Sequence, residues 1–321
     1  MNRLRSFCRA NGLIWIVVLA LSAAFLLWNA GFDFNYVIPK RAGRLAAIVI
    51  GGVCVAWSSI IFQTITGNRI LTPAIMGYEA VYLLLQSVLV FAMGVQSLIV
   101  LGENGHFVAS VGLMLAYSWL LHRCLFRSGD NNNVYFLLLL GLVLTMVIGT
   151  FSQFVQLKTS PGEFAILQGF SQASFNKPRT GQLLASAGIV AAILLAGIRA
   201  LPVLDVLALG REQAISLGVD YPRHVRLHFA LIAVLVAVST SLLGPTAFMG
   251  VFIANITYAL ARTAQHRVVL SLGCGMAIAV FLVAQLLVEH LFNYKTTVGI
   301  LVNLVCGAYF LILMVRKRGY A

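Results

Sequence analysis

The chain has 321 residues, of which 60% are hydrophobic and only 10% are charged. Soluble domains carry about 25% charged residues, so this composition excludes a soluble fold and indicates that lipid surrounds most of the chain. The formal net charge is +13. The basic residues lie in short gaps between apolar runs, which favours contact with anionic lipid headgroups over nucleic-acid binding.

The N-terminus combines basic residues with an apolar run. Arg3, Arg5 and Arg9 precede the stretch from Leu13 to Trp28, and no clear small-residue cleavage site follows. We therefore expect a first transmembrane helix that is retained in the mature protein, and not a signal peptide.

Further apolar runs of similar length follow along the whole chain. A spanning helix needs about 20 mostly apolar residues, and a membrane barrel would need alternating strands, which are not seen here. We expect an all-α polytopic bundle of about ten spans that forms a single transmembrane domain, residues 1–321. The predicted spans are 12–29, 43–64, 72–94, 106–122, 134–156, 181–201, 226–243, 246–262, 268–291 and 297–315.

The distribution of basic residues orients these spans. With the N-terminus in the cytoplasm, 15 of the 22 lysines and arginines lie on the cytoplasmic side, including the tail from Arg316 to Arg318. Cytoplasmic loops are enriched in such residues, so we expect both termini in the cytoplasm of a bacterial cell and the chain in its inner membrane.

Few residues suggest chemistry within the membrane. Glu79 is the one candidate for a buried carboxylate, either as a proton relay or as a polar group satisfied by neighbouring helices or facing a wet pathway. His224 and His228 share a helix face, where a solvated basic helix start is favoured over a metal site. The five cysteines are expected to be small buried hydrophobes. We find no Walker A or enzyme motif, and predict no catalytic site, no metal site and no bound cofactor.

One predicted cytoplasmic loop, about residues 202–224, differs from the others. Gly210 is expected to start a short helix, Glu212 lies in its first turn, and Gly218 suits the left-handed position that ends it. Leu209, Ala214 and Leu217 would form a small apolar face. Such a helix suits docking into a groove of a partner, or resting on the lipid surface.

This segment, which we call the coupling segment, resembles the pattern LG-x-x-x-A-x-x-LG of the FecCD-type permeases. Leu209, Gly210, Ala214, Leu217 and Gly218 match it. These permeases serve ABC importers of iron–siderophore complexes, haem and vitamin B12. In the family this loop carries the helix that sits in a cleft of the ATPase subunit.

Four other stretches resemble family motifs in the family order. They are 41–44 (R-x-P-R), 63–80 (Q-x-x-x-x-NPLA-x-P followed by ILG), 244–250 (G-x-I-x-F-x-G) and 297–310 (P-x-G-x-x-T-x-x-x-G-x-P-x-F). Together with the coupling segment they cover nearly the whole chain. The resemblance implies a BtuC-like type II importer permease.

The chain also departs from these motifs. Ala254-Asn255 replaces the family's PH, Arg69 follows Asn68 where the family has proline, and Gly43 replaces the proline of R-x-P-R. Such changes resemble a subgroup associated with catecholate siderophores, in which an acidic residue at the position of Glu79 also occurs. The resemblance therefore implies a ferric siderophore cargo, and makes vitamin B12 less favoured.

The family resemblance also implies partners and residue roles. Two permease subunits, either identical or paralogous, would form the pathway between them, with ATPase subunits that bind ATP and Mg²⁺ below and a periplasmic siderophore-binding protein above. Arg41, Arg44 and Lys295 are candidates for docking the binding protein, with lipid headgroups as the alternative. The candidates for the pathway or its gate are Asn68, Glu79, Asn131, Asn132 and Asn133.

Two other functions remain open from the sequence. An ion-gradient-driven secondary transporter would depend on Glu79 and need no ATPase. A membrane-embedded assembly subunit would have no transport pathway.

Overall fold

The computed structural model describes residues 2–28, 35–94, 102–126, 134–176, 180–261 and 263–318, and within these ranges it contains helices and no strand. The α-helices are α1 (Asn2–Leu27), α2 (Val37–Thr66), α3 (Tyr78–Met93), α5 (Gly102–Phe126), α6 (Val134–Gln156), α7 (Pro161–Phe170), α8 (Thr180–Leu207), α9 (Arg211–Ser216), α10 (Tyr221–Leu243), α11 (Ala247–Ala261), α12 (His266–Leu286) and α13 (Val298–Arg318). A 3-10 turn, η1 (Pro73–Met76), precedes α3, and a π-helical turn, η2 (Leu287–Leu291), extends α12.

Each of the ten predicted spans overlaps one of these α-helices over most of its length. Five helical stretches in the described part are long and apolar enough to cross a membrane: Val37–Thr66, Leu138–Gln156, Thr180–Leu207, Tyr221–Leu243 and His266–Leu291. Four further spans fall on shorter apolar stretches, namely Asn11–Leu27, Tyr78–Met93, Phe248–Ala261 and Val298–Tyr309. The remaining one falls on the 25-residue α5.

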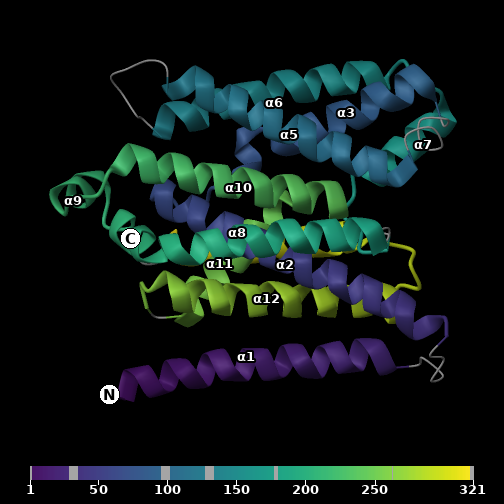
Figure 1. Ribbon diagram of the computed structural model, residues 1–321. Helices are drawn as coiled ribbons and strands as arrows, with labels where there is room; N and C mark the ends of the chain where they lie inside the picture. Colours follow the sequence, from purple (N-terminus) through teal and green to yellow (C-terminus); the bar gives the residue numbers. More distant parts are fainter. Residues whose placement is uncertain are drawn as a thin grey trace.

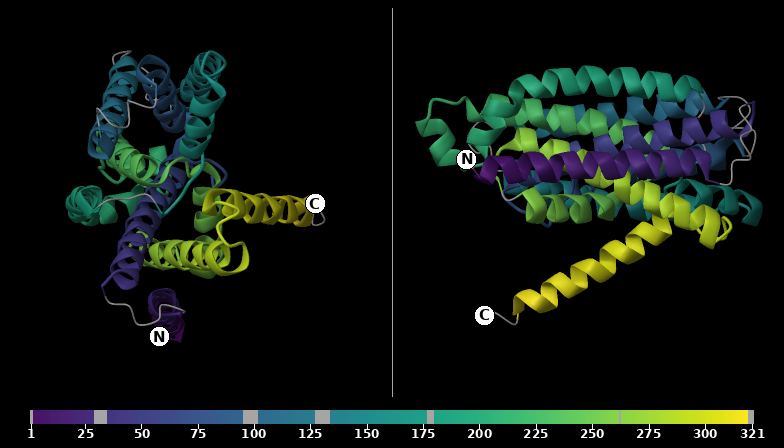
Figure 2. Two further views of the ribbon diagram at one scale, coloured as in Figure 1. Left: turned by 90° about the vertical axis from the view of Figure 1, so that its right-hand side faces the viewer. Right: turned by 90° about the horizontal axis from the view of Figure 1, so that it is seen from below.

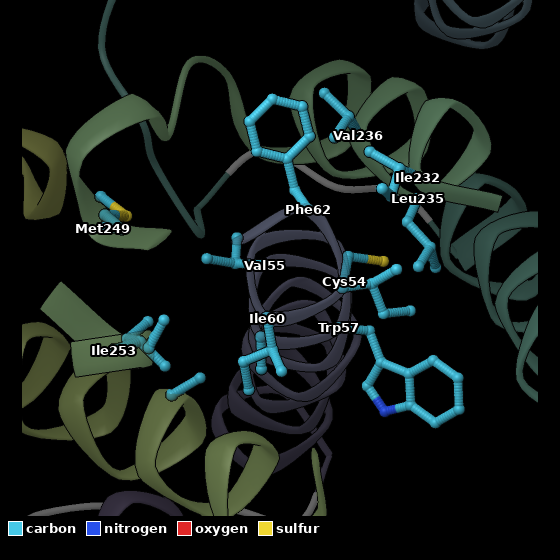
Figure 3. Packing of buried hydrophobic residues seen from close by; sticks show 14 of the residues in the cluster. Cys54, Val55, Trp57, Ile60, Phe62, Ile232, Leu235, Val236, Met249 and Ile253 are labelled. Carbon is cyan, nitrogen blue, oxygen red and sulfur yellow. The ribbon is translucent and has the colours of Figure 1, made fainter. Parts of the chain in front are cut away.

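The core is built around α2, which packs against α10, α12, α8 and α11. Figure 3 shows this packing: Cys54, Val55, Trp57, Ile60 and Phe62 of α2 point in several directions toward residues of α10 and α11. Close approach to α12 is possible because a Cβ at Gly52 would lie only 3.1 Å from the backbone nitrogen of Ile278. Small residues at such crossings let helices pack tightly in lipid.

A second group of helices, α3, α5, α6 and α7, lies beside this core and joins it through the contact of α5 with α10 (Figure 1). The short α7 begins with a capping box between Ser160 and Glu163. The hydrogen bonds from Ser160 hold the pKa of the Glu163 carboxyl below its ordinary value.

The two chain ends and α9 lie at the same end of the bundle (Figures 1 and 2). This agrees with the prediction that both termini and the coupling segment share one side of the membrane. Figure 2 also shows that α13 diverges from the other helices along its length, so that its C-terminal half stands apart from them.

The predicted span 72–94 is not one continuous helix. The backbone turns at Gly77, whose φ of +87° lies in the left-handed region that favours glycine, and α3 starts directly after it. Thr145 of α6 donates to the carbonyl of Ile75 (3.1 Å), and Tyr117 of α5 donates to the carbonyl of Met76 (2.8 Å). Neighbouring helices thus satisfy the carbonyls that the break leaves free.

Candidate functional site

The coupling segment folds as a short helix with glycine at both ends. Gly210, with φ of +103°, is the N-cap of α9, and Gly218, with φ of +81°, follows its last turn. The N–H of Gly218 donates to Ile215 (2.9 Å) and that of Val219 to Ala214 (3.0 Å). This is the double hydrogen bond of a Schellman motif, which requires a left-handed residue at the position of Gly218. Both predicted ends of the helix are correct.

The predicted apolar face of this helix is only partly correct. Ala214 is fully buried against the rest of the chain, whereas Leu209, Ile215 and Leu217 are exposed, by 57%, 52% and 63%. Ala214 therefore anchors α9 and does not offer a contact to a partner. The prediction from the sequence did not include Ile215 in the exposed apolar group. The polar residue Glu212 is exposed in the first turn. The outward apolar group is Leu209, Ile215 and Leu217.

At the opposite end of the bundle, Arg41 and Arg44 have different roles. Arg41 is 7% exposed; its Nη1 donates to the carbonyls of Phe25 (3.0 Å) and Trp28 (2.6 Å), and its Nη2 donates to Glu289 (2.7 Å). It thus caps the C-terminal end of α1 and pairs with a carboxylate on η2. This contradicts the prediction that Arg41 faces a docking partner.

Arg44 is the more accessible of the two arginines, with 25% of its side chain exposed. Its guanidinium donates to the Tyr294 hydroxyl (2.9 Å) and lies 3.6 Å from Glu289. Tyr294 and Asn293 both have positive φ, so the turn after η2 is held in an uncommon conformation for residues other than glycine. Arg44, Tyr294 and the exposed Lys295 form a surface group that the sequence indicated only through its cations.

Glu79 lies where two helix starts meet. It is in the first turn of α3, and its Oε1 accepts the backbone N–H of Thr246 (2.7 Å), which directly precedes α11. A carboxylate is stabilised at the N-terminal end of a helix by unpaired N–H groups and by the helix dipole. Of the two roles left open by the sequence, this geometry favours a group satisfied by neighbouring helices over a proton relay.

The predicted gate residues are only partly described. Asn68 accepts the N–H of Ile70 (2.9 Å), which makes an Asx turn directly after α2. Asn131, Asn132 and Asn133 lie outside the described residues.

A cavity of about 470 Å³ with both polar and apolar side chains in its lining lies between α3, α5, α7, α8 and α10. His106 Nδ1 lies 3.2 Å from the side-chain oxygen Oε1 of Gln86, and the Gln86 side-chain NH₂ donates to the Ser110 hydroxyl (3.2 Å). Gln172 and Asn176, from the non-helical segment between α7 and α8, also line it. Irregular backbone among membrane helices is tolerated where it is buried in protein or meets water. Among the described residues, no group of three His, Cys, Asp or Glu could hold a metal ion.

A model of the FecCD transport family matches residues 11–316. This chain belongs to the FecCD transport family. It is 36% identical to the petrobactin import system permease protein YclO of Bacillus subtilis, over 92% of this chain and 93% of that protein. It is 31% identical to the petrobactin import system permease protein FatC of Bacillus anthracis, over 95% of this chain and 89% of that protein.

Solved structures show the same fold. A metal-chelate type ABC transporter in an inward-facing conformation superposes with a TM-score of 0.82 at 17% identity, over 96% of this chain and 99% of that chain. The predicted BtuC-like fold is therefore confirmed. FecCD proteins are the permease subunits of ABC transporters, so this chain is a multi-pass membrane permease and not itself an enzyme.

Two of the chain's departures from the FecCD motifs contact each other. The Asn255 amide of α11 donates to the carbonyl of Arg69 (3.0 Å), and the Arg69 guanidinium lies over the Tyr258 ring at 4.8 Å. Both Arg69 and Asn255 were recognised in the sequence as separate substitutions. Because they meet in space, they form one alternative way of fixing the loop that follows α2.

Proposed function

We propose that this chain is the permease of an ABC importer that moves ferric siderophores of the catecholate type across the bacterial inner membrane. The observation that carries the cargo assignment is the pair of relatives above 30% identity, both named petrobactin import permeases, each matched over more than nine-tenths of this chain. The ferric enterobactin permease FepG of Escherichia coli, 25% identical over 92% of this chain, supports the same class.

In this function α9 receives the ATPase subunit. Leu209, Ile215 and Leu217 are exposed apolar side chains in or next to α9, at the end that also holds both termini. Exposed apolar side chains on a short surface helix suit a groove on a partner. The partner binds ATP and Mg²⁺, and its movement displaces α9 of this chain.

At the opposite end, Arg44 and Lys295 receive the siderophore-binding protein. Both are cations on the surface, and Tyr294 holds the Arg44 guanidinium in place through a 2.9 Å hydrogen bond. A guanidinium held in this way is suited to a carboxylate on a docking partner. Arg41 is excluded from this surface by its internal hydrogen bonds.

A second, paralogous permease completes the importer. Bacillus subtilis has two relatives that share one system name, the petrobactin import permeases YclO and YclN, which are 36% and 23% identical to this chain. Two different permease proteins in one import system favour a heterodimer for this chain as well.

The test measures uptake of iron-55-labelled ferric petrobactin by cells that lack the chromosomal copy of this chain and carry a tagged replacement. The double variant Ile215→Asp plus Leu217→Asp places two charges on the outward face of α9. Leu157→Asp is the matched control, because Leu157 is an 83% exposed leucine outside the coupling segment. ATPase recovery with the tagged chain and its amount in the membrane are measured in the same cells.

We expect the double variant to lose uptake and ATPase recovery together while it stays in the membrane, and Leu157→Asp to retain both. Uptake that continues without the ATPase would contradict the importer function. Normal transport of a ferric hydroxamate, with no transport of ferric petrobactin by the wild type, would contradict the cargo class alone.

A further inference from the structure

Three polar side chains connect the end of α8 with the start of α12 and the end of α2. Asp205 Oδ1 accepts the backbone N–H of His266 (2.8 Å) and its ring Nδ1–H (2.6 Å). The opposite ring nitrogen, Nε2, lies 2.8 Å from the Thr64 hydroxyl. His266 is only 4% exposed, so the imidazole is enclosed between the two partners.

These hydrogen bonds among Asp205, His266 and Thr64, which we call the bridge, begin shortly before α9. Asp205 lies in the last turn of α8, which ends at Leu207. Three residues, Ala208, Leu209 and Gly210, separate the end of α8 from the start of α9. The neighbouring residue Leu204 is fully buried, so this turn is fixed in the core. A displacement of α9 therefore acts on the backbone that carries the Asp205 carboxylate.

The bridge continues through the start of α12. Gln265, the N-cap residue of α12, makes no side-chain capping hydrogen bond, and Asp205 from α8 supplies the acceptor instead. A carboxylate at this position is also favoured by the helix dipole. Charge-assisted hydrogen bonds are short, so the partly exposed Asp205 carboxylate and the buried His266 hold the end of α8 against the start of α12.

The bridge ends on α2, next to the loop that carries Asn68. Thr64 is in the last turn of α2, and its hydroxyl also donates to the carbonyl of Ile60 (2.8 Å). The loop after Thr66 leads through Asn68 to η1 and Gly77, where the α3 span is broken. The three residues thus connect the end of α8, which the chain joins to α9 through a short loop, with the end of α2, which it joins to the broken span through the loop with Asn68.

We propose that Asp205, His266 and Thr64 are positioning residues that transmit the movement of α9 to the end of α2, and so link ATP hydrolysis by the partner to opening of the pathway. This proposal rests on the proposed function, because α9 moves only if an ATPase binds there. A plain capping role would stabilise the fold without changing how much cargo moves for each ATP hydrolysed.

The test uses the whole importer, purified through a tag on this chain and reconstituted into liposomes. ATP hydrolysis and uptake of ferric petrobactin, delivered by the binding protein, are measured in the same preparation. The test variants are Asp205→Asn, which removes the charge, and Thr64→Val, which removes only the hydroxyl. Their matched controls are Glu163→Gln, at a carboxylate that caps α7 outside the coupling segment, and Thr64→Ser, which keeps the hydroxyl.

We expect both test variants to hydrolyse ATP at close to the wild-type rate while uptake per ATP falls about tenfold, within the usual range of coupling between sites. The two controls should behave as the wild type. An unchanged ratio, or a parallel loss of hydrolysis and uptake, would overturn the proposal. Thr64→Val keeps the test valid if Asp205→Asn fails to fold. A wild-type complex without cargo-stimulated hydrolysis would instead contradict the proposed function itself.

Discussion

Single residues of the same type have different roles in this permease, and burial decides which role each has. Arg41 and Arg44 are three apart on α2, and the sequence correctly placed them on one face, since both reach Glu289. The sequence could not reveal that the end of α1 would cover Arg41. That information lies in the contact of Arg41 with Phe25 and Trp28, which belong to another helix.

The two arginines should therefore respond differently to removal. Arg41→Ala removes the 2.7 Å partner of the Glu289 carboxylate, so that only Arg44 at 3.6 Å remains beside it, and takes the Arg41 donor away from the carbonyls of Phe25 and Trp28. Loss of one partner of a buried ion pair costs about 3–5 kcal/mol, and the remaining Arg44 places the expected cost at the lower end of this range. Arg44→Ala should cost about 0–1 kcal/mol, because its pair is partly exposed. We expect a clear drop in the thermal unfolding temperature of detergent-purified Arg41→Ala only.

Binding-protein affinity should show the reverse order. Arg44→Ala should weaken docking of the siderophore-binding protein while its unfolding temperature stays near that of the wild type. If Arg41→Ala unfolds at the wild-type temperature and no longer binds the siderophore-binding protein, Arg41 has the docking role that the sequence predicted.

At the scale of elements, the interruptions of helices hold much of the functional geometry. The break at Gly77 places Glu79 in the first turn of α3, facing the start of α11. The sequence contains the local signals for this break, Pro73 and Gly77, although the apolar run 72–94 suggested one span. It contains no signal that Thr246, which lies 167 positions after Glu79 in the chain, is the hydrogen-bond partner of Glu79.

Substitution of Glu79 separates the ATP-driven and the gradient-driven transporter. Glu79→Gln keeps an oxygen that can accept the Thr246 N–H, so uptake should stay within about threefold of the wild type, equivalent to less than about 1 kcal/mol. Glu79→Leu leaves this N–H unpaired, at a cost of about 1–3 kcal/mol, and should impair the protein much more. Uptake is measured in proteoliposomes loaded with ATP, with and without a protonophore. Loss of uptake in Glu79→Gln together with sensitivity to the protonophore would favour a proton relay.

The coupling segment shows which parts of an element the sequence can predict. Its ends were predictable because Gly210 and Gly218 occupy conformations that glycine favours. Its outward face was not predictable, because a helix of six residues presents apolar side chains on more than one side. Packing against α8 and α10 decides that Ala214 points inward and Ile215 outward.

At the scale of the whole molecule, α13 packs against α11 and α12 and then diverges from the other helices along its length. Figure 2 shows it standing away from the bundle, and Leu304 and Leu311 are each 67% exposed. Asn303 and Gly307 are also exposed on this helix. Apolar side chains can face lipid, but a polar amide beside a small residue favours contact with another helix. We therefore expect α13 to contact the second permease.

Two differently tagged copies of this chain, expressed together in cells that retain the partner permease, distinguish the possible dimers. For a heterodimer, purification through one tag should recover the paralogous permease and not the second tagged copy. Asn303→Leu should reduce this recovery, because it removes the amide from the contact, whereas Leu311→Ile changes only the shape of an exposed apolar side chain and should leave recovery intact. Recovery of both tagged copies together would establish a homodimer, and an Asn303→Leu variant that still recovers the partner fully would exclude α13 as the contact helix.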